Sequence, residues 1–223
     1  AENFLRNYLK KMAEANGFFT PPPVLEINAN VVREGVAGIA VVAPSGQVLV
    51  ASEFLPALKE DGFIDVLKEN AARQRGLWNM RLDGEGQPSL GLIVPIYPVD
   101  AADNAKPIAY AVGLKQVAKD IFPLMTQPGE NLKSGENYLV QEKPGTSGNT
   151  VQFLTPRREP LPNGTKPMTS DCPNDTETSA AAFALKQPGA FGIRPSYANV
   201  PSLVLGRKIA GTPWVVVRTA SEE

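Results

Sequence analysis

Few side chains in this sequence of 223 residues can do chemistry: it contains no histidine and one cysteine, Cys172. Without histidine, neither a Ser-His-Asp triad nor a Cys-His pair can form. A metal site would have only oxygen ligands and a single thiol, which disfavours a transition-metal enzyme. Cys172 lies in the polar stretch 171–174 and is expected to be an incidental loop thiol, and one cysteine cannot form an internal disulfide.

Paired carboxylates are the remaining route to acid–base catalysis, as in glycosidases. The candidates, in turns and on charged helical segments, are Asp61, Asp65, Asp83 and Glu85. Solvated side chains are the usual occupants of such positions. We therefore expect no catalytic residue, no metal and no cofactor, and predict that the chain is not an enzyme. A carboxylate enzyme stays as an alternative, which turnover abolished by one carboxylate substitution would support.

The composition is that of a folded chain, with 43% hydrophobic and 20% charged residues, long enough for one large core or two small ones. Lys and Arg total 22 against 23 Asp and Glu. No overall field therefore attracts nucleic acid or an anionic membrane. No apolar run reaches the roughly 18 to 20 residues that span a bilayer. Both ends look cut from a longer protein.

An amphipathic helix opens the chain, because its apolar residues recur at spacings of one, three and four residues. They are Phe4, Leu5, Tyr8, Leu9 and Met12. Gly17 ends this pattern. Pro21 to Pro23 then form an extended connector, since proline fixes φ and lacks an N–H group.

A first α+β module follows the connector. The β-branched runs 38–43 and 47–51 flank Pro44-Ser45-Gly46, which predicts a β-hairpin. A helical pattern covers 56–75, and three more strands are expected at 77–82, 89–97 and 107–114. This order is that of a PAS-like module, an antiparallel sheet covered by helices with a pocket between them.

The same order recurs once, after a short linker helix expected at 115–125. The second set comprises a hairpin from 135–141 and 150–155, a helix at 179–186, and strands at 190–197, 202–209 and 213–219. The predicted fold is therefore α+β: an N-terminal helix followed by two PAS-like modules, each a central antiparallel five-stranded sheet flanked by helices. The expected boundaries are 1–23 for the helix and connector, 24–125 for the first module and 126–223 for the second.

Two motifs of the second module resemble the membrane-proximal module of double Cache sensor domains. One is a strand pair, Gly135-Glu136-Asn137-Tyr138-Leu139-Val140 and Phe153-Leu154-Thr155-Pro156. The other is the closing block 197–217, which contains Gly211-Thr212-Pro213-Trp214 and has Asn199 where the family has a glycine. Tyr138 and Trp214 are expected in the core. The first module resembles the family mainly by the order of its elements.

Double Cache domains lie outside the cytoplasmic membrane between two transmembrane helices, bind a small molecule and signal to a cytoplasmic output module. The resemblance therefore implies a periplasmic sensor domain of an inner-membrane receptor. Histidine kinase, diguanylate cyclase and chemoreceptor outputs all stay open. Ligand binding would act by shifting the population between two receptor states.

In amino-acid-binding members of the family, an Arg-x-Trp segment and an aspartate on the last strand of the membrane-distal module hold the ligand. The nearest equivalents in this chain are Arg73, Arg75 and Trp78, with Lys115 about where the aspartate is expected. A lysine would repel an ammonium group. The alignment therefore implies a carboxylate or another anion, held by Arg75 through a bidentate fork and by Lys115 as a point charge.

Tyr97 and Tyr110 lie on predicted strands that would line the same pocket, each with a hydroxyl able to bind a ligand. Structural interpretations stay open for all six residues: solvated ends for the three cations, and core packing for the three aromatic residues. In the second module only Arg194 and Tyr197 suggest converging polar groups. We expect that module to bind nothing.

A ligand-free interaction module is the second alternative. The helix bearing Phe4, Tyr8 and Met12 would then form a homodimer, or a partner protein would dock on the distal end. This alternative predicts concentration-dependent self-association and no stabilisation by small molecules. No nucleic-acid partner is expected.

Overall fold

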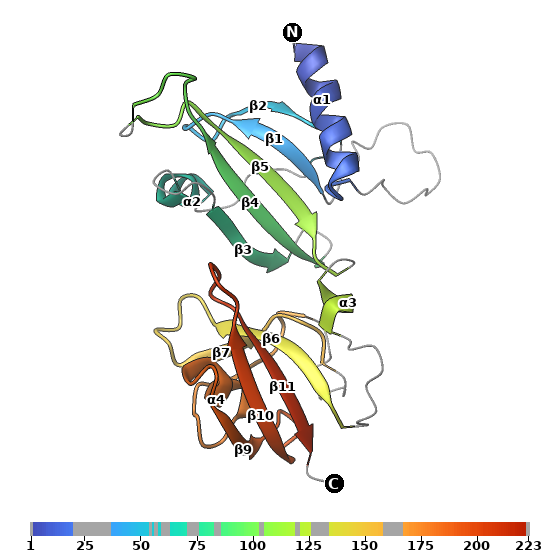
Figure 1. The fold of residues 1–223 in the computed structure, drawn as a ribbon, viewed down its shortest axis with the longest axis vertical. Coiled ribbons are helices and arrows are strands. Elements are labelled where there is room, and N and C mark those ends of the chain that lie inside the picture. Colours follow the sequence, from blue (N-terminus) through green and yellow to red (C-terminus); the bar gives the residue numbers. More distant parts are fainter. Residues whose placement is uncertain are drawn as a thin grey trace. The chain divides into compact units, whose positions relative to one another are not determined.

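The computed structural model describes residues 2–19, 37–53, 55, 58, 63–70, 76–82, 86–102, 105–118, 121–125, 134–157 and 167–221. The chain divides into two compact units, 1–117 and 118–223, called here the first and second modules. Each module contains one antiparallel sheet (Figure 1). The α+β architecture of an N-terminal helix and two antiparallel sheets is therefore confirmed. The sequence-based boundary between residues 125 and 126 stays a prediction.

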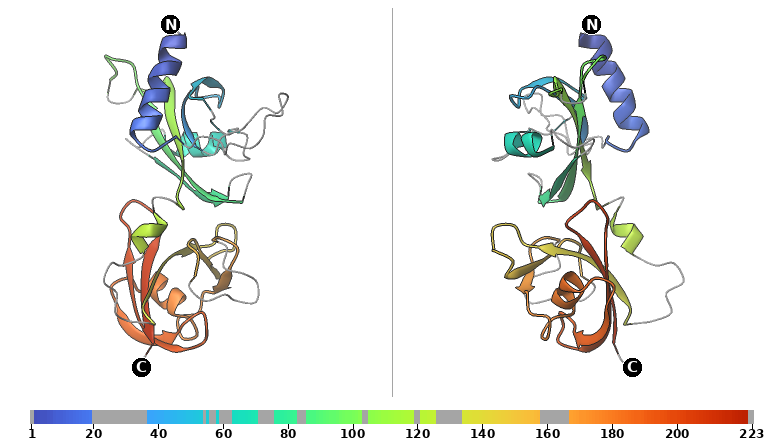
Figure 2. Two further views of the ribbon diagram at one scale, coloured as in Figure 1. Left: turned by 90° about the vertical axis from the view of Figure 1, so that its right-hand side faces the viewer. Right: turned by 60° about the vertical axis from the view of Figure 1, so that its left-hand side comes forward.

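The first module has two described helices and five strands. They are α1 (Glu2–Ala15), β1 (Gly38–Val42), β2 (Val48–Ala51), α2 (Phe63–Asn70), β3 (Gly76–Leu82), β4 (Pro88–Ile96) and β5 (Ala109–Gln116). The strand order is β2-β1-β5-β4-β3, and every neighbouring pair is antiparallel. α1 contacts β1 and β2, whereas α2 contacts β3 and β4. The two helices lie on opposite faces of the sheet (Figure 2).

The core of the first module lies between the sheet and α2. Side chains alternate between the two faces of a strand. Tyr110, Val112 and Leu114 of β5 therefore point to the same face, where they belong to one buried cluster with Phe63 and Leu67 of α2. We call this the α2 face, and the opposite one the α1 face.

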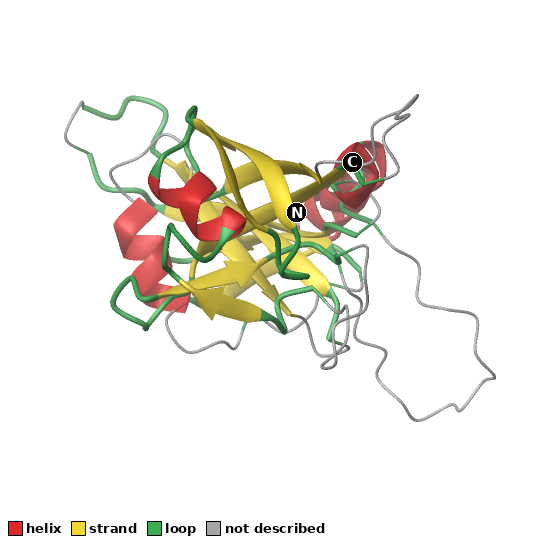
Figure 3. Ribbon diagram, turned by 90° about the horizontal axis from the view of Figure 1, so that it is seen from below, coloured by secondary structure: helices red, strands yellow, loops and turns green. Residues whose placement is uncertain are grey.

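The second module has a six-stranded sheet of order β8-β7-β6-β11-β10-β9. Its elements are α3 (Phe122–Met125), β6 (Glu136–Glu142), β7 (Thr150–Phe153), β8 (Asp171–Pro173), α4 (Ala180–Lys186), β9 (Phe191–Pro195), β10 (Pro201–Lys208) and β11 (Val215–Ser221). Ser179 caps α4, its hydroxyl accepting a hydrogen bond from Ala182 N. α4 packs on the sheet and buries Phe183 with four alanines, and Tyr138 and Trp214 are in the core as expected. In the described part of the chain, helices are few beside the strands (Figure 3).

The structure corrects the predicted elements in three places. The second sheet has six strands rather than five, because residues 171–173 form β8 at its edge. The linker helix expected at 115–125 is only Phe122–Met125, since Lys115 and Gln116 pair with β4 and extend β5. α2 begins at Phe63. Much of the remaining helical segment expected at 56–75 lies outside the described residues.

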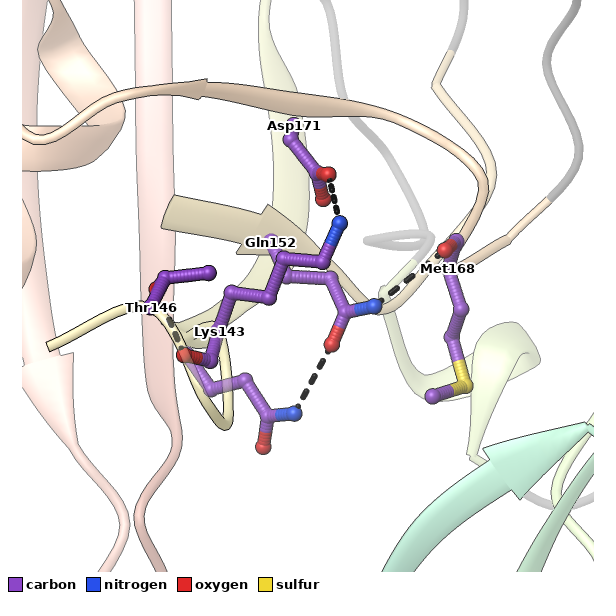
Figure 4. Close-up of polar contacts among 6 residues, drawn as sticks. Lys143, Thr146, Gln152, Met168 and Asp171 are labelled. Atoms are coloured by element: carbon purple, nitrogen blue, oxygen red, sulfur yellow. Dashed lines mark hydrogen bonds and ion pairs between the residues drawn. The ribbon is translucent and has the colours of Figure 1, made fainter. Parts of the chain in front are cut away.

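Polar contacts link β6, β7 and the segment that leads into β8 (Figure 4). Gln141 Nε2 donates to Gln152 Oε1 at 3.0 Å, and Gln152 Nε2 donates to the Met168 carbonyl at 3.2 Å. Lys143 forms an ion pair with Asp171 on β8 itself. β8 therefore lacks the alternation of apolar and polar residues by which a strand is recognised in a sequence.

Candidate functional site

Trp78 on β3 occupies the α2 face of the first module. Its side chain is buried, and its ring centroid lies 4.6 Å from that of Phe63 on α2. Gly91 pairs with Trp78 across the sheet, and a Cβ added there would lie 2.7 Å from Trp78 Cβ. The missing side chain at Gly91 makes room for the indole. Trp78 is therefore a core residue whose position depends on both α2 and β4.

Arg81 lies directly on Trp78. Its guanidinium carbon is 3.5 Å from the centroid of the Trp78 ring, within cation–π range. In a regular strand, residues three apart point to opposite faces. Here the β3–β4 register shifts between Trp78 and Arg81, a bulge that brings both side chains to the α2 face. Sequence analysis missed Arg81, because period-2 alternation would have placed it opposite Trp78.

Tyr110 and Tyr97 flank the same face. Tyr110 is buried in the cluster that contains Trp78, and burial raises the pKa of its hydroxyl, with a further contribution from nearby Tyr97. Tyr97, just beyond β4, is 38% exposed. The pair thus extends from the core to solvent. Trp78, Tyr97 and Tyr110 of the predicted set thus share one face of the sheet, but Trp78 is level with Gly91 of β4 and Tyr110 with Pro95, so the two tyrosines lie farther along that face.

Lys115 does not join them. It follows Leu114 on β5 and points to the α1 face, where its Nζ lies 5.6 Å from the ring centroid of Phe18. Phe18 comes directly after α1 and also covers Gly113, the neighbouring position on that face. Arg73 and Arg75 lie outside the described residues. The cation that the structure places beside the aromatic group is therefore Arg81.

This arrangement can bind an anion. A guanidinium held against an aromatic face keeps a planar set of N–H donors that matches a carboxylate or phosphate. The rings of Trp78 and Phe63 beside it offer apolar contact. We call Trp78 and Arg81 the α2-face site.

In the second module, Arg194 and Tyr197 bind different partners. Arg194 Nε donates to the Thr176 carbonyl at 2.7 Å, its Nη2 lies 3.3 Å from the Glu177 carboxylate, and its guanidinium stacks on Phe183. Tyr197 instead donates a hydrogen bond to Glu136 on β6. These two residues, the only ones in which the sequence suggested converging polar groups, therefore have separate partners.

A different polar cluster, missed by the sequence analysis, surrounds Tyr197. Arg157 is buried at 6% exposure, donates to the Ser170 hydroxyl, and places its guanidinium carbon 4.7 Å from the Phe153 ring centroid and 5.0 Å from that of Tyr197. Burial lowers the pKa of Arg157, and nearby Tyr197 and Glu136 oppose this effect. A lone arginine past the end of a strand carries no sequence signal for such a position.

The catalytic alternatives gain no support from the described residues. Asp65 is exposed and pairs with Lys68 at 3.4 Å, while Asp61, Asp83 and Glu85 lie outside the described residues. Cys172 is not a loop thiol as expected: it lies on β8, 3.4 Å from the Ser179 hydroxyl, and burial raises its pKa. Within the described ranges, no three Cys, Asp or Glu residues cluster as metal ligands, and no helix is long and apolar enough to cross a bilayer.

Comparison with solved structures identifies the fold. The extracellular domain of the putative histidine kinase vpHK1S-Z8 aligns with a TM-score of 0.56 at 14% identity, covering 98% of this chain and 76% of that domain. The corresponding domain of the putative histidine kinase rpHK1S-Z16 gives 0.56 and 14%, covering 100% of this chain and 78% of that domain. No protein-family model and no curated protein sequence matches the chain.

An extracellular ligand binding receptor from Desulfohalobium retbaense is also similar, with a TM-score of 0.53 at 12% identity. The alignment covers 97% of this chain but 33% of that protein, so the chain spans about a third of its length. Identities this low establish the fold alone. At that level, the comparison agrees with the fold that the sequence motifs predicted from their resemblance to double Cache domains.

Proposed function

We propose that this chain is the extracytoplasmic small-molecule-sensing domain of a transmembrane signalling receptor. The observation that carries the proposal is the alignment of nearly the whole chain with extracellular domains of two putative histidine kinases. The third similar structure is described as a ligand binding receptor. In this proposal the periplasmic domain binds its ligand without converting it. The output is a histidine kinase, a diguanylate cyclase or a chemoreceptor module.

The α2-face site of the first module is the proposed place of ligand binding. Trp78 comes from the predicted set, and Arg81 adds the cation held on it. Tyr97 and Tyr110 lie farther along the same face and stay in the proposal only as residues of that face. Arg73 and Arg75 precede β3 in the chain and stay in the proposal as further cations. Lys115 leaves it, because its side chain lies on the α1 face.

A small carboxylate or another anion is the proposed ligand class. Arg81 supplies the positive charge that the sequence-based hypothesis assigned to Arg75 and Lys115. Stacking on Trp78 fixes the guanidinium plane, so less conformational entropy is lost when a bidentate contact forms.

The test is a thermal-shift screen of the chain against small carboxylates, inorganic phosphate, amino acids, amines and sugars. A ligand that binds only the folded state stabilises it by RT ln(1 + [L]/Kd), about 2.7 kcal/mol at a hundredfold excess over Kd. For a chain of this size we expect anions to raise Tm by about 5–10 °C. Arg81→Met should remove at least about half of that shift, because it keeps the apolar stem but deletes the charge.

Lys115→Met is the matched control, since it deletes a cation from the other face of the same sheet, where Lys115 pairs with Leu90 of β4 and Arg81 with Ser89. We expect it to leave the anion-induced shift unchanged. Loss of the shift in Lys115→Met with retention in Arg81→Met would move the site to the α1 face. A screen in which no compound class stabilises the chain would contradict the sensing proposal.

Homodimerisation through α1 is the second candidate, favoured by one observation. Leu9 and Ala13 are buried, but Phe4, Tyr8 and Met12 on the adjoining stripe of the helix are 78%, 53% and 39% exposed. Exposed apolar stripes of this kind often mark contact surfaces. Lys10, 2.9 Å from Glu53 beyond β2, helps to hold the helix in place on its own module.

Tyr8→Glu tests this candidate by placing a charge on the exposed apolar stripe. If α1 forms a dimer, light scattering should show the dimer dissociation constant rising at least about tenfold, the effect of roughly 1.4 kcal/mol. Asn7→Glu adds the same charge at an exposed position about 100° around the helix from Tyr8, at the edge of the stripe, and should weaken assembly less than Tyr8→Glu does. A wild-type chain that stays monomeric at every concentration would exclude the candidate.

A further inference from the structure

In the second module, a buried cation lies against a group of three packed aromatic rings. The ring centroids of Tyr138, Phe153 and Tyr197 lie 5.4 Å, 6.0 Å and 6.0 Å from one another. The Arg157 guanidinium carbon stands over two of these rings, at 4.7 Å from Phe153 and 5.0 Å from Tyr197. Aromatic faces carry negative charge density and attract cations, most strongly where water is excluded. We call the three rings and the Glu136 carboxylate the aromatic cage.

The polar groups of the cage also suit a cation. Tyr197 Oη donates a hydrogen bond to the Glu136 carboxylate, which orients this anion at the edge of the cage. Ser170 accepts a hydrogen bond from Arg157 Nη2. Glu136 would repel a bound anion, so the cluster is not a second version of the α2-face site. A guanidinium is more weakly hydrated than an ammonium group and is therefore the less costly cation to bury there.

The cage joins segments that are distant in the sequence. Glu136 and Tyr138 lie on β6, Phe153 ends β7, and Arg157 follows it. Tyr197 lies in the turn between β9 and β10. These segments meet around one guanidinium, so its removal should loosen all of them together.

We propose that the second module contains a cation-binding site and that Arg157 fills this site as an internal ligand. The module then needs no external molecule to order the cage. The chemical class that the cage accepts when the Arg157 side chain is absent is a small alkylguanidinium, with an alkylammonium binding more weakly. This proposal concerns the second module and does not depend on anion binding in the first.

Chemical rescue tests the proposal. Arg157→Ala in the full chain should lower Tm by about 5–10 °C, because the cation–π contacts and the buried hydrogen bond are lost. Ethylguanidinium at about 20 mM should then restore at least about 2 °C by binding the vacated cage. Ethylammonium should restore less, and the neutral isostere ethylurea should restore nothing. The wild-type chain should respond to none of the three.

Arg194→Ala is the matched control, because this arginine also stacks on a ring of the same module, at 4.7 Å from Phe183, but lies partly exposed beside Glu177. Ethylguanidinium should not stabilise it. An equal shift in both variants, or none in Arg157→Ala, would overturn the proposal. If Arg157→Ala fails to fold, Arg157→Lys and Arg157→Met replace it. The lysine variant keeps the positive charge and should be more stable than the methionine variant. A methionine variant as stable as the wild-type chain would also overturn the proposal.

Discussion

Trp78→Ala is expected to lower the free energy of unfolding by about 3–5 kcal/mol, the usual cost of deleting a large buried ring. The indole is 7% exposed, stacks on Phe63 at 4.6 Å and supports the Arg81 guanidinium at 3.5 Å. Removing it leaves a cavity under α2 and takes away the surface on which Arg81 rests. Urea denaturation followed by far-UV circular dichroism measures the change.

Trp78→Phe is the companion variant, since a smaller ring keeps part of the contact with Phe63 and a face for Arg81. Its cost should be nearer about 1–2 kcal/mol, because less volume is lost. A cost below about 1 kcal/mol for Trp78→Ala would show that the side chain is not part of the core. Its role would then be limited to contact with a ligand, the other interpretation that the sequence left open.

Much of the fold follows from local patterns, because the strands form where β-branched residues alternate between turn residues. The hairpin of β1 and β2 and the strands β3, β4 and β5 all occur close to their expected positions. The patterns fail where pairing with a neighbouring strand decides the conformation. Lys115 and Gln116 fit an amphipathic helix, but Leu90 and Ser89 pair with them and extend β5. Tertiary pairing overrides local preference at such positions.

β8 shows the same limit from the opposite side. Asp171-Cys172-Pro173 has no apolar alternation, and its strand conformation depends on the edge of β7 and on the ion pair between Lys143 and Asp171. The partner residues lie far away in the sequence. A search for periodicity within a short window therefore has nothing to detect there.

The candidate site is predicted less completely than the fold, because a site depends on which face each side chain occupies. Trp78, Tyr97 and Tyr110 have aromatic side chains at strand positions that proved to share a face. Arg81 was missed because one bulged residue in β3 reverses the face of every residue after it. Lys115 was included because a motif alignment gives the position of a residue along a strand. It does not tell which face of the sheet the side chain occupies.

The second module owes its helix–sheet packing to small residues, and Gly206 on β10 is the closest point. An added Cβ there would lie 2.6 Å from both the Cβ and the carbonyl oxygen of Ala184 on α4, and 2.8 Å from its Cα. Two of these three atoms belong to the helix backbone, so a rotamer change cannot relieve the clash. Four buried alanines give α4 the short side chains that such an approach requires.

Gly206→Ala is therefore expected to destabilise the chain by about 3 kcal/mol, the upper part of the usual range for overpacking. Tryptophan fluorescence during urea denaturation measures the effect, since Trp214 lies buried in the same module. Gly192→Ala on β9 is the control: its new Cβ would meet the far end of the Phe183 ring at 3.0 Å, which can move aside. We expect a cost below about 1 kcal/mol there. Equal costs for the two variants would mean that α4 does not approach β10 as closely as the structure shows.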